Sequence, residues 1–588
     1  MDKERIYGLL LQIYDAEAAS AVLERLDSLL QKYVSQIPTP RSVGLSERDA
    51  ILITYPDQVQ EPGRASLATL AEFCGHFLTD LISGIHILPF YPWSSDDGFA
   101  VTDYRSVARQ YGDWNHIRRL GEHFRLMFDA VINHASSQSH WFEGFLQDAP
   151  QCRGYFIEVD GNPDLSAVVR PRALPLLTEF KSAAGIKRVW TTFSADQIDL
   201  NYHNPEVLLE VLDILLLYAT HGAQFIRLDA IAYLWKEFGT SCIHLPQTHK
   251  IIQLIRAILD EVAPHIQLIT ETNVPQSENL SYFGHGFKEA QLVYNFPLPP
   301  LVLHTIQTGD ASILSRWAST MDLPPEGGAL LNFLASHDGI GLNPLHGILP
   351  EPEIDALVQH IKARGSPVSY KTNSDGTERP YELNVNYFDA LDEADSRETQ
   401  ALEVDRFITA HAILLAFIGI PAIYFHSMFG SRGWLNGPAE TGRNRSINRE
   451  KLNRETLERE LADTNSLRAQ VFGRLSHLLA VRAAQPCFSP HGTQRVLESS
   501  SRIFALLRTA PGTAKPALCI HNVSAQPEQS NLDLSNTSLA PFSELHDIIS
   551  GRRIRAESSL SLLLAPYESV WLSTTDDASL GVQNDRLS

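Results

Sequence analysis

The chain of 588 residues is 44% hydrophobic and 20% charged, and 48 basic against 69 acidic side chains give a net charge of −21. This length predicts a large domain with at least one smaller one, and the acidic balance argues against a nucleic-acid partner or an anionic membrane surface. Five cysteines without metal-type spacing, the absence of an apolar run of membrane-spanning length and an N-terminus unlike a secretory signal predict a cytoplasmic protein.

Helical periodicity runs through residues 1–45, which end in the Pro-punctuated stretch SQIPTPRS and are predicted to form an N-terminal helical extension. From there onward, short apolar runs alternate with amphipathic helical stretches. The eight runs predicted as strands span residues 50–55, 84–90, 126–132, 225–230, 267–272, 292–296, 330–335 and 421–425. Near-continuous apolar strands separated by helices are typical of a parallel sheet with both faces covered.

Eight such strands predict an α/β fold, a (β/α)8 TIM barrel, over residues 46–480. The barrel is expected to carry an inserted loop domain at about 135–192, after the third strand, and a second insertion at 338–400, after the seventh. A doubly wound sheet is the alternative, but no glycine-rich turn follows the first strand to support it. Short strands between polar turns over residues 488–578 predict a small C-terminal antiparallel β domain.

Charged and polar side chains interrupt the predicted strands at their carboxyl ends. They are Asp129, Asn133 and His134 on the third strand, Arg227 and Asp229 on the fourth, Glu271 on the fifth, and His337 and Asp338 on the seventh. In a TIM barrel this rim is where catalytic groups from different strands meet. Carboxylates on three strand ends, joined by histidines and an arginine, therefore favour an active site over isolated structural ion pairs.

Four segments together resemble the α-amylase superfamily of retaining glycosidases. The segments are DAVINH (129–134), FIRLDA (225–230), ETN (271–273) and NFLASHD (332–338), in the order and at the kind of spacing of that superfamily's signature segments. Retaining glycosidases use one ionised carboxylate to form a glycosyl ester and a second, initially protonated carboxyl group to assist the leaving group. The resemblance therefore implies a covalent glycosyl–enzyme intermediate.

The same resemblance implies a role for each residue at the strand ends. Asp229 is implied as the nucleophile, Glu271 as the general acid/base, and Asp338 as the group that holds sugar hydroxyls and stabilises the transition state. Arg227, two residues before Asp229 on the same strand face, is expected to keep Asp229 ionised. Asp129 is expected to support its neighbours structurally. Two histidines are expected to donate hydrogen bonds to glucose hydroxyls, His134 and His337.

A second set of segments resembles the sucrose phosphorylase group of this superfamily. GIHILPFYPWSSDDGFAVTDY (84–104) is one of them, and VVRPRALPLL (168–177) resembles the Arg-Pro-Arg loop that contacts phosphate in that group. Because an arginine fork offers phosphate two parallel donors, Arg172 is the expected phosphate ligand and Arg170 the alternative. Two further residues are implied at the glucose site, Asp96 and Phe193.

The acceptor side is expected along SYKTNSDGTERPYELNVNYFDAL (369–391), in which Tyr381 is implied near phosphate. Enzymes of the group act on sucrose, sucrose phosphate, glucosylglycerol or glucosylglycerate. Glu382, a predicted substrate-binding residue, stands where glutamine is expected in the sucrose enzymes. The chain length, the N-terminal extension and the SDGT…PYELN pattern resemble the glucosylglycerate phosphorylases. A glycerate carboxylate needs a nearby cation, and three residues are candidates: Arg379, Lys371 and Arg445.

The resemblance thus implies an enzyme that performs reversible phosphorolysis of a small α-glucoside, giving α-D-glucose 1-phosphate with retention. Glucosylglycerate is the preferred substrate, and sucrose or glucosylglycerol are the alternatives. Two more distant alternatives are an amylosucrase-like transglucosidase and a non-catalytic amylase-like binding protein. The Arg-Pro-Arg loop argues against the transglucosidase, which needs no phosphate. The retained catalytic acids argue against the binding protein. The partners are inorganic phosphate and the glucoside; no cofactor or metal is implied, and the oligomeric state is open.

Overall fold

A closed barrel of eight parallel strands forms the centre of the computed structural model, which describes residues 2–40, 44–172, 174–284, 288–321, 324, 327–372, 377–392, 398–510, 512 and 515–574. The barrel strands are β1 (Ile51–Thr54), β3 (Gly84–Ile87), β4 (Arg125–Ala130), β9 (Ala223–Leu228), β10 (Gln267–Thr270), β11 (Leu292–Tyr294), β12 (Ala329–Asn332) and β16 (Ile420–Tyr424). They neighbour one another in chain order, and each corresponds to a predicted strand. The predicted TIM barrel is therefore confirmed.

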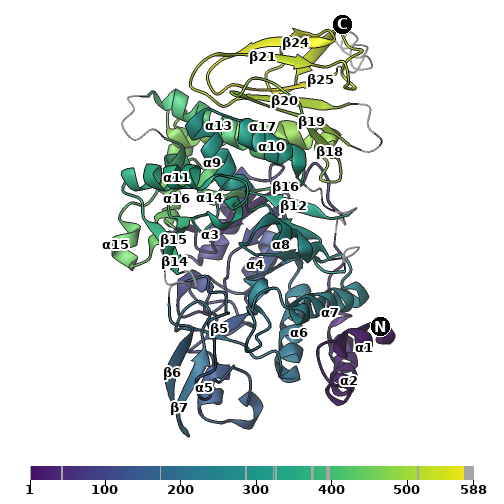
Figure 1. Ribbon diagram of the computed structural model, residues 1–588, viewed down its shortest axis with the longest axis vertical. Helices are drawn as coiled ribbons and strands as arrows, with labels where there is room; N and C mark the ends of the chain where they lie inside the picture. The colour runs from purple at the N-terminus through teal and green to yellow at the C-terminus, as the bar shows by residue number, and fades with distance from the viewer. Residues whose placement is uncertain are drawn as a thin grey trace.

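The barrel strands are short and apolar because both of their faces are covered. Every residue of β1, β3, β12 and β16 is buried. The main covering helices are α3 (Ser66–Phe77), α4 (Trp114–Gly121), α6 (Pro205–Thr220), α7 (Pro246–Val262), α9 (Leu298–Thr308), α13 (Gln400–Ala416) and α17 (Leu467–Ala483). Helices alternate with strands along the chain, so the helical layer surrounds the sheet (Figure 1).

The seam between the first and last strands closes the barrel. Ile51 pairs with Ala422 of β16 on one side and with Gly84 of β3 on the other. Arg482, a buried residue of α17, donates hydrogen bonds across this seam, to the carbonyl oxygen of Asp49 at 3.2 Å and to that of Gly419 at 3.1 Å. One guanidinium thus joins the backbone segments that lead into β1 and β16.

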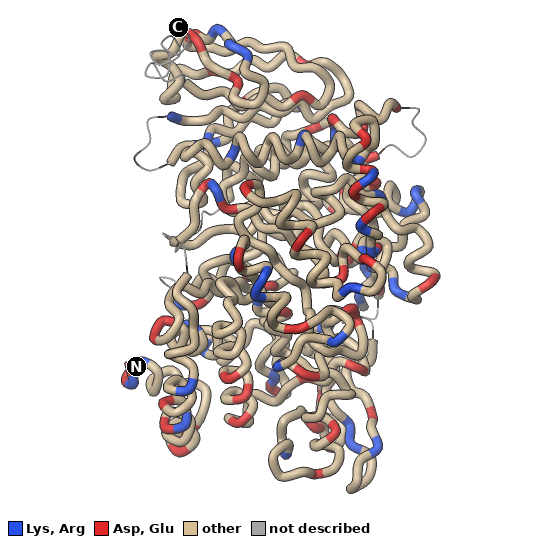
Figure 2. The backbone as a smooth tube through the Cα atoms, turned by 180° about the vertical axis from the view of Figure 1, so that it is seen from behind, with Lys and Arg blue, Asp and Glu red and all other residues tan. Residues whose placement is uncertain are grey.

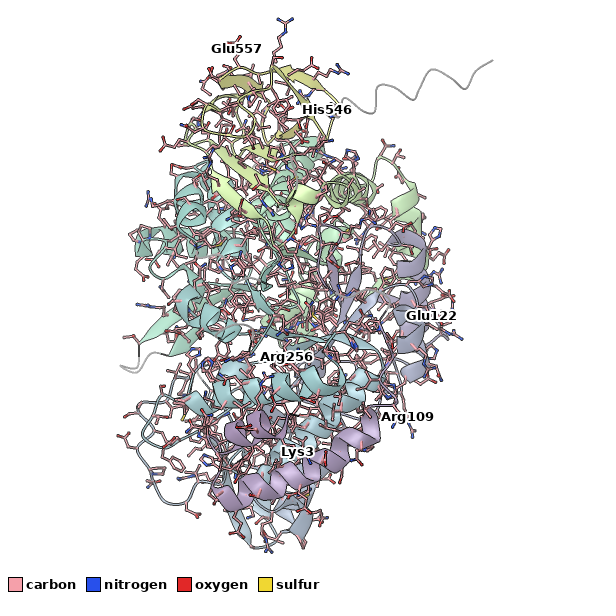
Figure 3. All side chains as sticks on the ribbon, turned by 90° about the vertical axis from the view of Figure 1, so that its right-hand side faces the viewer. Lys3, Arg109, Glu122, Arg256, His546 and Glu557 are labelled. Carbon is pink, nitrogen blue, oxygen red and sulfur yellow. The ribbon has the colours of Figure 1, made fainter. Side chains whose placement is uncertain are left out.

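Two N-terminal helices lie outside the barrel against its helical layer. Helix α1 (Lys3–Leu10) packs on α7, and α2 (Ala16–Tyr33) packs on α6. Figure 3 shows this side, with Lys3 of α1 and Arg256 of α7 labelled. The Tyr14 hydroxyl donates a hydrogen bond of 2.9 Å to the carbonyl oxygen of Tyr202, which precedes α6. Of the predicted extension, residue 1 and residues 41–43 lie outside the described residues.

Two long excursions stand over the carboxyl ends of the barrel strands. The first, after β4, contains β5 (His134–Ser136), α5 (His140–Leu146), β6 (Leu177–Ser182), β7 (Gly185–Trp190) and β8 (Gln197–Asp199). The second, after β12, contains β13 (Ile340–Gly341), α11 (Glu351–Ala363), β14 (Val368–Thr372), β15 (Glu378–Leu383) and α12 (Tyr387–Leu391). Strands β13, β15 and β14 form a three-stranded sheet in that order. Residue 173 of the first excursion and residues 373–376 and 393–397 of the second lie outside the described residues.

The described residues from 493 to 574 form antiparallel β structure, as predicted. A six-stranded sheet has the order β18 (Thr493–Val496), β19 (Ile503–Thr509), β20 (Ala517–Asn522), β25 (Ser569–Ser573), β22 (Glu544–Asp547), β23 (Arg553–Arg555). Strands β21 (Glu528–Asp533) and β24 (Ser559–Leu564) form a second, two-stranded sheet. Figure 1 shows these strands together at one end of the molecule. The predicted end of this domain, residues 575–578, lies outside the described residues.

Basic and acidic residues are interspersed over the face seen in Figure 2. In the part of the chain that the structure describes, no helix combines the length and the apolar composition that a bilayer-spanning segment needs.

Candidate active site

A cavity of about 90 Å³ opens at the carboxyl ends of the barrel strands. Its lining includes twelve residues singled out from the sequence: Asp96, His134, Arg172, Phe193, Arg227, Asp229, Glu271, His337, Asp338, Tyr381, Glu382 and Arg445. We call the part formed by the ends of β4, β9, β10 and β12 the floor. These residues come from positions 96 to 445, so the fold gathers side chains that are far apart in the chain.

Arg227 joins two carboxylates on the floor. Its Nη1 donates to Asp229 Oδ1 at 2.7 Å, and its Nη2 lies 3.8 Å from Glu271 Oε2. The same Glu271 oxygen accepts a hydrogen bond of 3.0 Å from the backbone N–H of Ala230. Arg227 and Asp229 meet because residues two apart on a strand project to the same face.

Asp129 lies beneath this pair and supports Arg227. It is fully buried, accepts a hydrogen bond from Arg227 Nη1, and its Oδ2 lies 2.7 Å from His86 Nε2. Burial acts to raise the pKa of Asp129, but Arg227 and His86 outweigh it and lower the pKa to about 2. Asp129 is not among the residues that line the cavity. Its position fits the supporting role expected from the sequence.

Asp229 and Glu271, the two carboxyl groups near Arg227, have higher pKa values than exposed acids. Burial, together with the charges of Asp229 and Asp338, raises the pKa of Glu271 to about 7 although Arg227 opposes this. Burial also raises the pKa of Asp229, and the contact with Arg227 counteracts the rise. Two carboxylates this near a single guanidinium favour a state in which one of them holds a proton. Glu271, which has the weaker contact with Arg227, is the one that can donate a proton near neutral pH.

Asp338 is the third acid, and it is held ionised. Burial acts to raise the pKa of Asp338, but Arg445, His337 and Arg449 outweigh it and lower the pKa well below its usual range. Arg445 Nη1 lies 2.5 Å from Asp338 Oδ1, and Arg449 Nη2 lies 3.6 Å from the same oxygen. Paired guanidinium groups therefore keep a permanent negative charge on this side of the cavity.

The two predicted histidine ligands lie on the cavity wall. The His337 ring stacks on Phe99 at 4.8 Å between centroids, and burial lowers its pKa to about 3, so the imidazole is neutral. His134 Nε2 lies 2.9 Å from the Phe99 carbonyl oxygen, and its Nδ1 lies 3.2 Å from the Asn133 side chain. Phe193 packs at 5.4 Å from the His134 ring. Protein groups thus orient both imidazoles, and their roles towards a sugar remain predictions.

A second cavity, of about 490 Å³, adjoins the first on its outer side and shares Arg172 and Tyr381 with it. We call this outer cavity the mouth. Among the described residues, Arg172 makes no hydrogen bond and no ion pair, although its charge acts on Asp96. Arg170 instead donates to the Leu174 carbonyl oxygen and lines neither cavity. The structure thus leaves Arg172, and not the alternative, available to a ligand.

Of the three cations considered for a glycerate carboxylate, two lie away from both cavities. Lys371 Nζ donates to Asn343 Oδ1 at 2.6 Å. Arg379 has a 45% exposed side chain that lies 4.0 Å from Glu351. Neither lines the inner or the outer cavity, so the cavity linings give no support to these two suggestions, which stay predictions. Arg445 lines both cavities but is already paired with acids, as described above for Asp338.

Several lining residues were not singled out from the sequence, among them Gln197, Asn273 and Phe99. Asn273 Nδ2 lies 3.4 Å from the Tyr381 hydroxyl, which joins the end of β10 to β15. Arg449 is a lining residue of the mouth that was also not singled out from the sequence. Its Nη1 lies 2.5 Å from Asp97 Oδ2 and 3.7 Å from Asp96 Oδ1. Asn273 is the last residue of the segment ETN, and Arg449 lies four residues after the predicted Arg445. Only their contacts across the fold distinguish them from neighbouring polar residues.

The arrangement combines three acids in different protonation states with the Arg172 guanidinium, which is unpaired within the described part of the chain. Asp229 can attack an electrophilic carbon, Glu271 can protonate a leaving oxygen, and Asp338 can accept hydrogen bonds. In the described ranges, no three His, Cys, Asp or Glu residues are grouped as they would be to hold a metal ion. The geometry suits acid/base-assisted substitution with an anion as acceptor.

Comparison with known proteins identifies similar chains of the same chemistry. The family described as "Alpha amylase, catalytic domain" matches residues 76–338. The chain is 47% identical over 586 residues to glucosylglycerate phosphorylase of Spirochaeta thermophila, covering 98% of this chain and 99% of that one. It is 44% identical to glucosylglycerate phosphorylase of Escherichia coli, covering 97% and 100% of the two chains.

More distant relatives share the fold. The chain is 30% identical to sucrose phosphorylase of Agrobacterium vitis, covering 74% of this chain and 88% of that one. The crystal structure of sucrose 6F-phosphate phosphorylase from Thermoanaerobacter thermosaccharolyticum matches with a TM-score of 0.73 at 23% identity, covering 90% of this chain and 100% of that one. The identity to the glucosylglycerate phosphorylases is thus well above that to the sucrose phosphorylases.

Proposed function

We propose that this chain, which belongs to the glycoside phosphorylases of the alpha-amylase family, catalyses the reversible phosphorolysis of glucosylglycerate to α-D-glucose 1-phosphate and glycerate. The observation that carries the proposal is the Arg172 guanidinium, which has no hydrogen-bond or ion-pair partner among the described residues and lines a cavity that three acids also line. A hydrolase needs the acids but has no need of a free cation beside them, because water carries no charge.

In the first half-reaction, Asp229 attacks C1 of the bound glucose. The bond from C1 to the bridging oxygen breaks as a bond to the Asp229 carboxylate forms, and Glu271 gives its proton to the departing glycerate. The raised pKa of Glu271, about 7, supports this role because a good part of the group is protonated at neutral pH. Asp338, ionised between guanidinium groups, is positioned to accept hydrogen bonds from sugar hydroxyls.

In the second half-reaction, a phosphate oxygen attacks C1 from the face that glycerate has left, and the bond from C1 to the Asp229 carboxylate breaks. The electron pair of that bond returns to Asp229, and the proton of hydrogen phosphate passes to Glu271. Two displacements at C1 return the α configuration, so the product is α-D-glucose 1-phosphate. Arg172 is the proposed phosphate ligand, since its planar fork can place two donors against a phosphate, and Tyr381 is proposed to assist from the opposite loop. Holding phosphate at the ester raises its effective concentration above that of an unbound water.

The inner cavity is also the proposed site for glucose itself. Asp96, His134, Phe193 and His337 line it and are proposed to contact the sugar, with Arg227 holding the nucleophile in place. Each of these roles is proposed from the cavity lining together with the family resemblance.

The decisive assay measures glucose 1-phosphate after incubation with glucosylglycerate, with and without inorganic phosphate. Parallel reactions contain sucrose and glucosylglycerol in place of glucosylglycerate. We expect phosphate-dependent product mainly from glucosylglycerate, and α-anomeric product by proton NMR. Glucose that is released equally well without phosphate refutes the phosphorylase proposal. A clear preference for sucrose refutes the choice of substrate but retains phosphorolysis.

A further inference from the structure

Glu382 is a buried acid in the second excursion whose partners are all protein groups. Its residue is 4% exposed, and it lies on β15, where it pairs with Gly341 of β13. Strand β13 follows Asp338 almost directly, so the strand that carries Glu382 is hydrogen-bonded to the segment that carries the third acid.

The first contact of Glu382 is with the backbone next to Asp338. Glu382 Oε1 accepts a hydrogen bond of 2.5 Å from the N–H of Gly339. A Cβ atom placed on Gly339 would lie 2.5 Å from the Leu383 carbonyl oxygen and 2.6 Å from Glu382 Cγ. Only glycine fits there, because β15 and the Glu382 side chain press directly on the backbone that follows Asp338.

The second contact reaches Asp338 through a guanidinium. Arg445 Nη2 donates to Glu382 Oε2 at 3.1 Å, and Arg445 Nε lies 3.0 Å from Glu382 Oε1. The other end of the same guanidinium, Nη1, lies 2.5 Å from Asp338 Oδ1. Arg445 is therefore held between two carboxylates, and its orientation towards Asp338 depends on Glu382.

We propose that Glu382 is a positioning residue that fixes Asp338 for the formation of the glucosyl–enzyme, acting through Arg445 and the Gly339 N–H. This inference deepens the function proposed above and rests on it for the role of Asp338. It differs from the expectation that Glu382 binds substrate. Glu382 lines both cavities, and its two oxygens are bonded to Arg445 and to the Gly339 N–H, so it acts on the segment of Asp338 whichever acceptor is used.

A substrate-binding role and a positioning role for Glu382 predict different results for the first half-reaction, which involves no acceptor. α-D-Glucosyl fluoride is a suitable donor: the C1–F bond breaks with its electron pair on fluoride while the C1–O bond to Asp229 forms, and no proton is needed. In a two-step mechanism, kcat/KM for the donor reports only the steps up to fluoride departure. An acceptor-binding residue leaves this quantity unchanged, whereas a residue that positions Asp338 lowers it.

The test compares wild type, Glu382→Gln and the control Glu378→Gln, an exposed residue on the same strand. Glutamine keeps an oxygen for Gly339 but loses the charge that holds Arg445. We expect Glu382→Gln to lower kcat/KM for glucosyl fluoride by about 10- to 100-fold, the factor for one charge-assisted hydrogen bond. The control should stay within about twofold of wild type. An unchanged kcat/KM in Glu382→Gln, with a raised KM for glycerate alone, overturns the proposal.

A double-mutant cycle excludes a merely structural effect. In the background of Arg445→Lys, the Glu382→Gln substitution should add less than about twofold, because the two residues act as one unit. Losses that multiply would show that Glu382 does not act through Arg445 and would overturn this route. The donor is independent of the natural substrate, so the two proposals fail separately. Wild-type enzyme that uses glucosyl fluoride but makes no glucose 1-phosphate from glucosylglycerate refutes the proposed function only.

Discussion

The floor and the mouth of the cavity differ in how their charges are balanced. On the floor, Arg227 is bonded to Asp229 and Asp129, with Glu271 nearby, so each charge has a fixed partner inside the protein. At the mouth, Arg172 has no such partner within the described part of the chain. A fully partnered group is fixed before substrate binds, whereas an unpartnered one is open to a ligand.

This difference indicates that the floor performs the bond-breaking steps and that the mouth selects the reactants. Preorganised charges lower the barrier of whatever glucoside is bound, because they need no rearrangement as the reaction proceeds. We infer that the mouth determines which acceptor takes the glucosyl group. Substitutions on the floor should therefore change the bond-breaking steps themselves, and substitutions at the mouth should discriminate among acceptors.

The largest effect is expected from Asp229→Asn on the floor. An amide cannot form the glucosyl ester, so turnover of every donor should fall by more than about 10⁴-fold. Glucose 1-phosphate formation and fluoride release from glucosyl fluoride measure this loss, and circular dichroism checks the fold. If one donor retained activity close to wild type, a different group would have to be the nucleophile.

Glu271→Gln should distinguish donors by their leaving groups. Loss of the acid should lower kcat for glucosylglycerate by about 10²- to 10⁴-fold. Glucosyl fluoride should lose much less in its first half-reaction, because fluoride departs without a proton. Equal losses for both donors in burst experiments would contradict the assignment of Glu271 as the acid.

The pH profile should report the same group in the unmodified enzyme. In the proposed mechanism Glu271 acts in its protonated form. Because its pKa is raised to about 7, this form is present below pH 7 and is lost above it. We expect kcat/KM for glucosylglycerate to fall about tenfold per pH unit above 7, while glucosyl fluoride shows no such decline. A midpoint near the ordinary value of a glutamic acid would contradict the burial argument.

Arg172→Ala should have a smaller and more selective effect, because it changes the mouth. We expect KM for phosphate to rise by about 10- to 100-fold, as for the loss of one charged hydrogen-bonding group, with kcat/KM for glucosyl fluoride changed by less than about threefold. Arg170→Ala is the matched control, since Arg170 lines neither cavity. If Arg170→Ala had the larger effect on phosphate, the two roles would be reversed.

The smallest effect is expected from Tyr14, which lies outside the barrel between the two N-terminal helices. Tyr14 bonds to the Tyr202 carbonyl oxygen, and the Tyr202 hydroxyl bonds at 2.8 Å to the carbonyl oxygen of Ile132 behind the floor. Tyr14→Phe should lower the free energy of unfolding by about 1 kcal/mol and leave kcat within about twofold. Chemical denaturation and the glucose 1-phosphate assay check the two parts. A large loss of kcat would mean that the N-terminal helices act on the floor directly.

Strand patterns alone brought the floor residues together, whereas the residues of the mouth were singled out only through the family resemblance, for a physical reason. Strand alternation and apolar runs place Arg227 and Asp229 on one face and bring Glu271 to the same rim, because parallel strands share their carboxyl ends. The pairing of Glu382 with Arg445 joins two loops, and no local pattern encodes it. For the same reason the family resemblance was needed to select Arg172, and three basic residues looked equally suited to glycerate until their surroundings were known.

The closing seam of the barrel bears on how the chain is made. Strand β1 borders β16, and Arg482 ties the backbone before both strands, so partners about 370 positions apart must meet. During synthesis the first seven strands emerge long before the eighth, and until then β1 and β12 expose unpaired sheet edges that invite association with other nascent chains. The ribosome must add residues through β16 before the sheet can become a ring, so premature termination upstream of Ile420 should leave an aggregation-prone product rather than a smaller working enzyme.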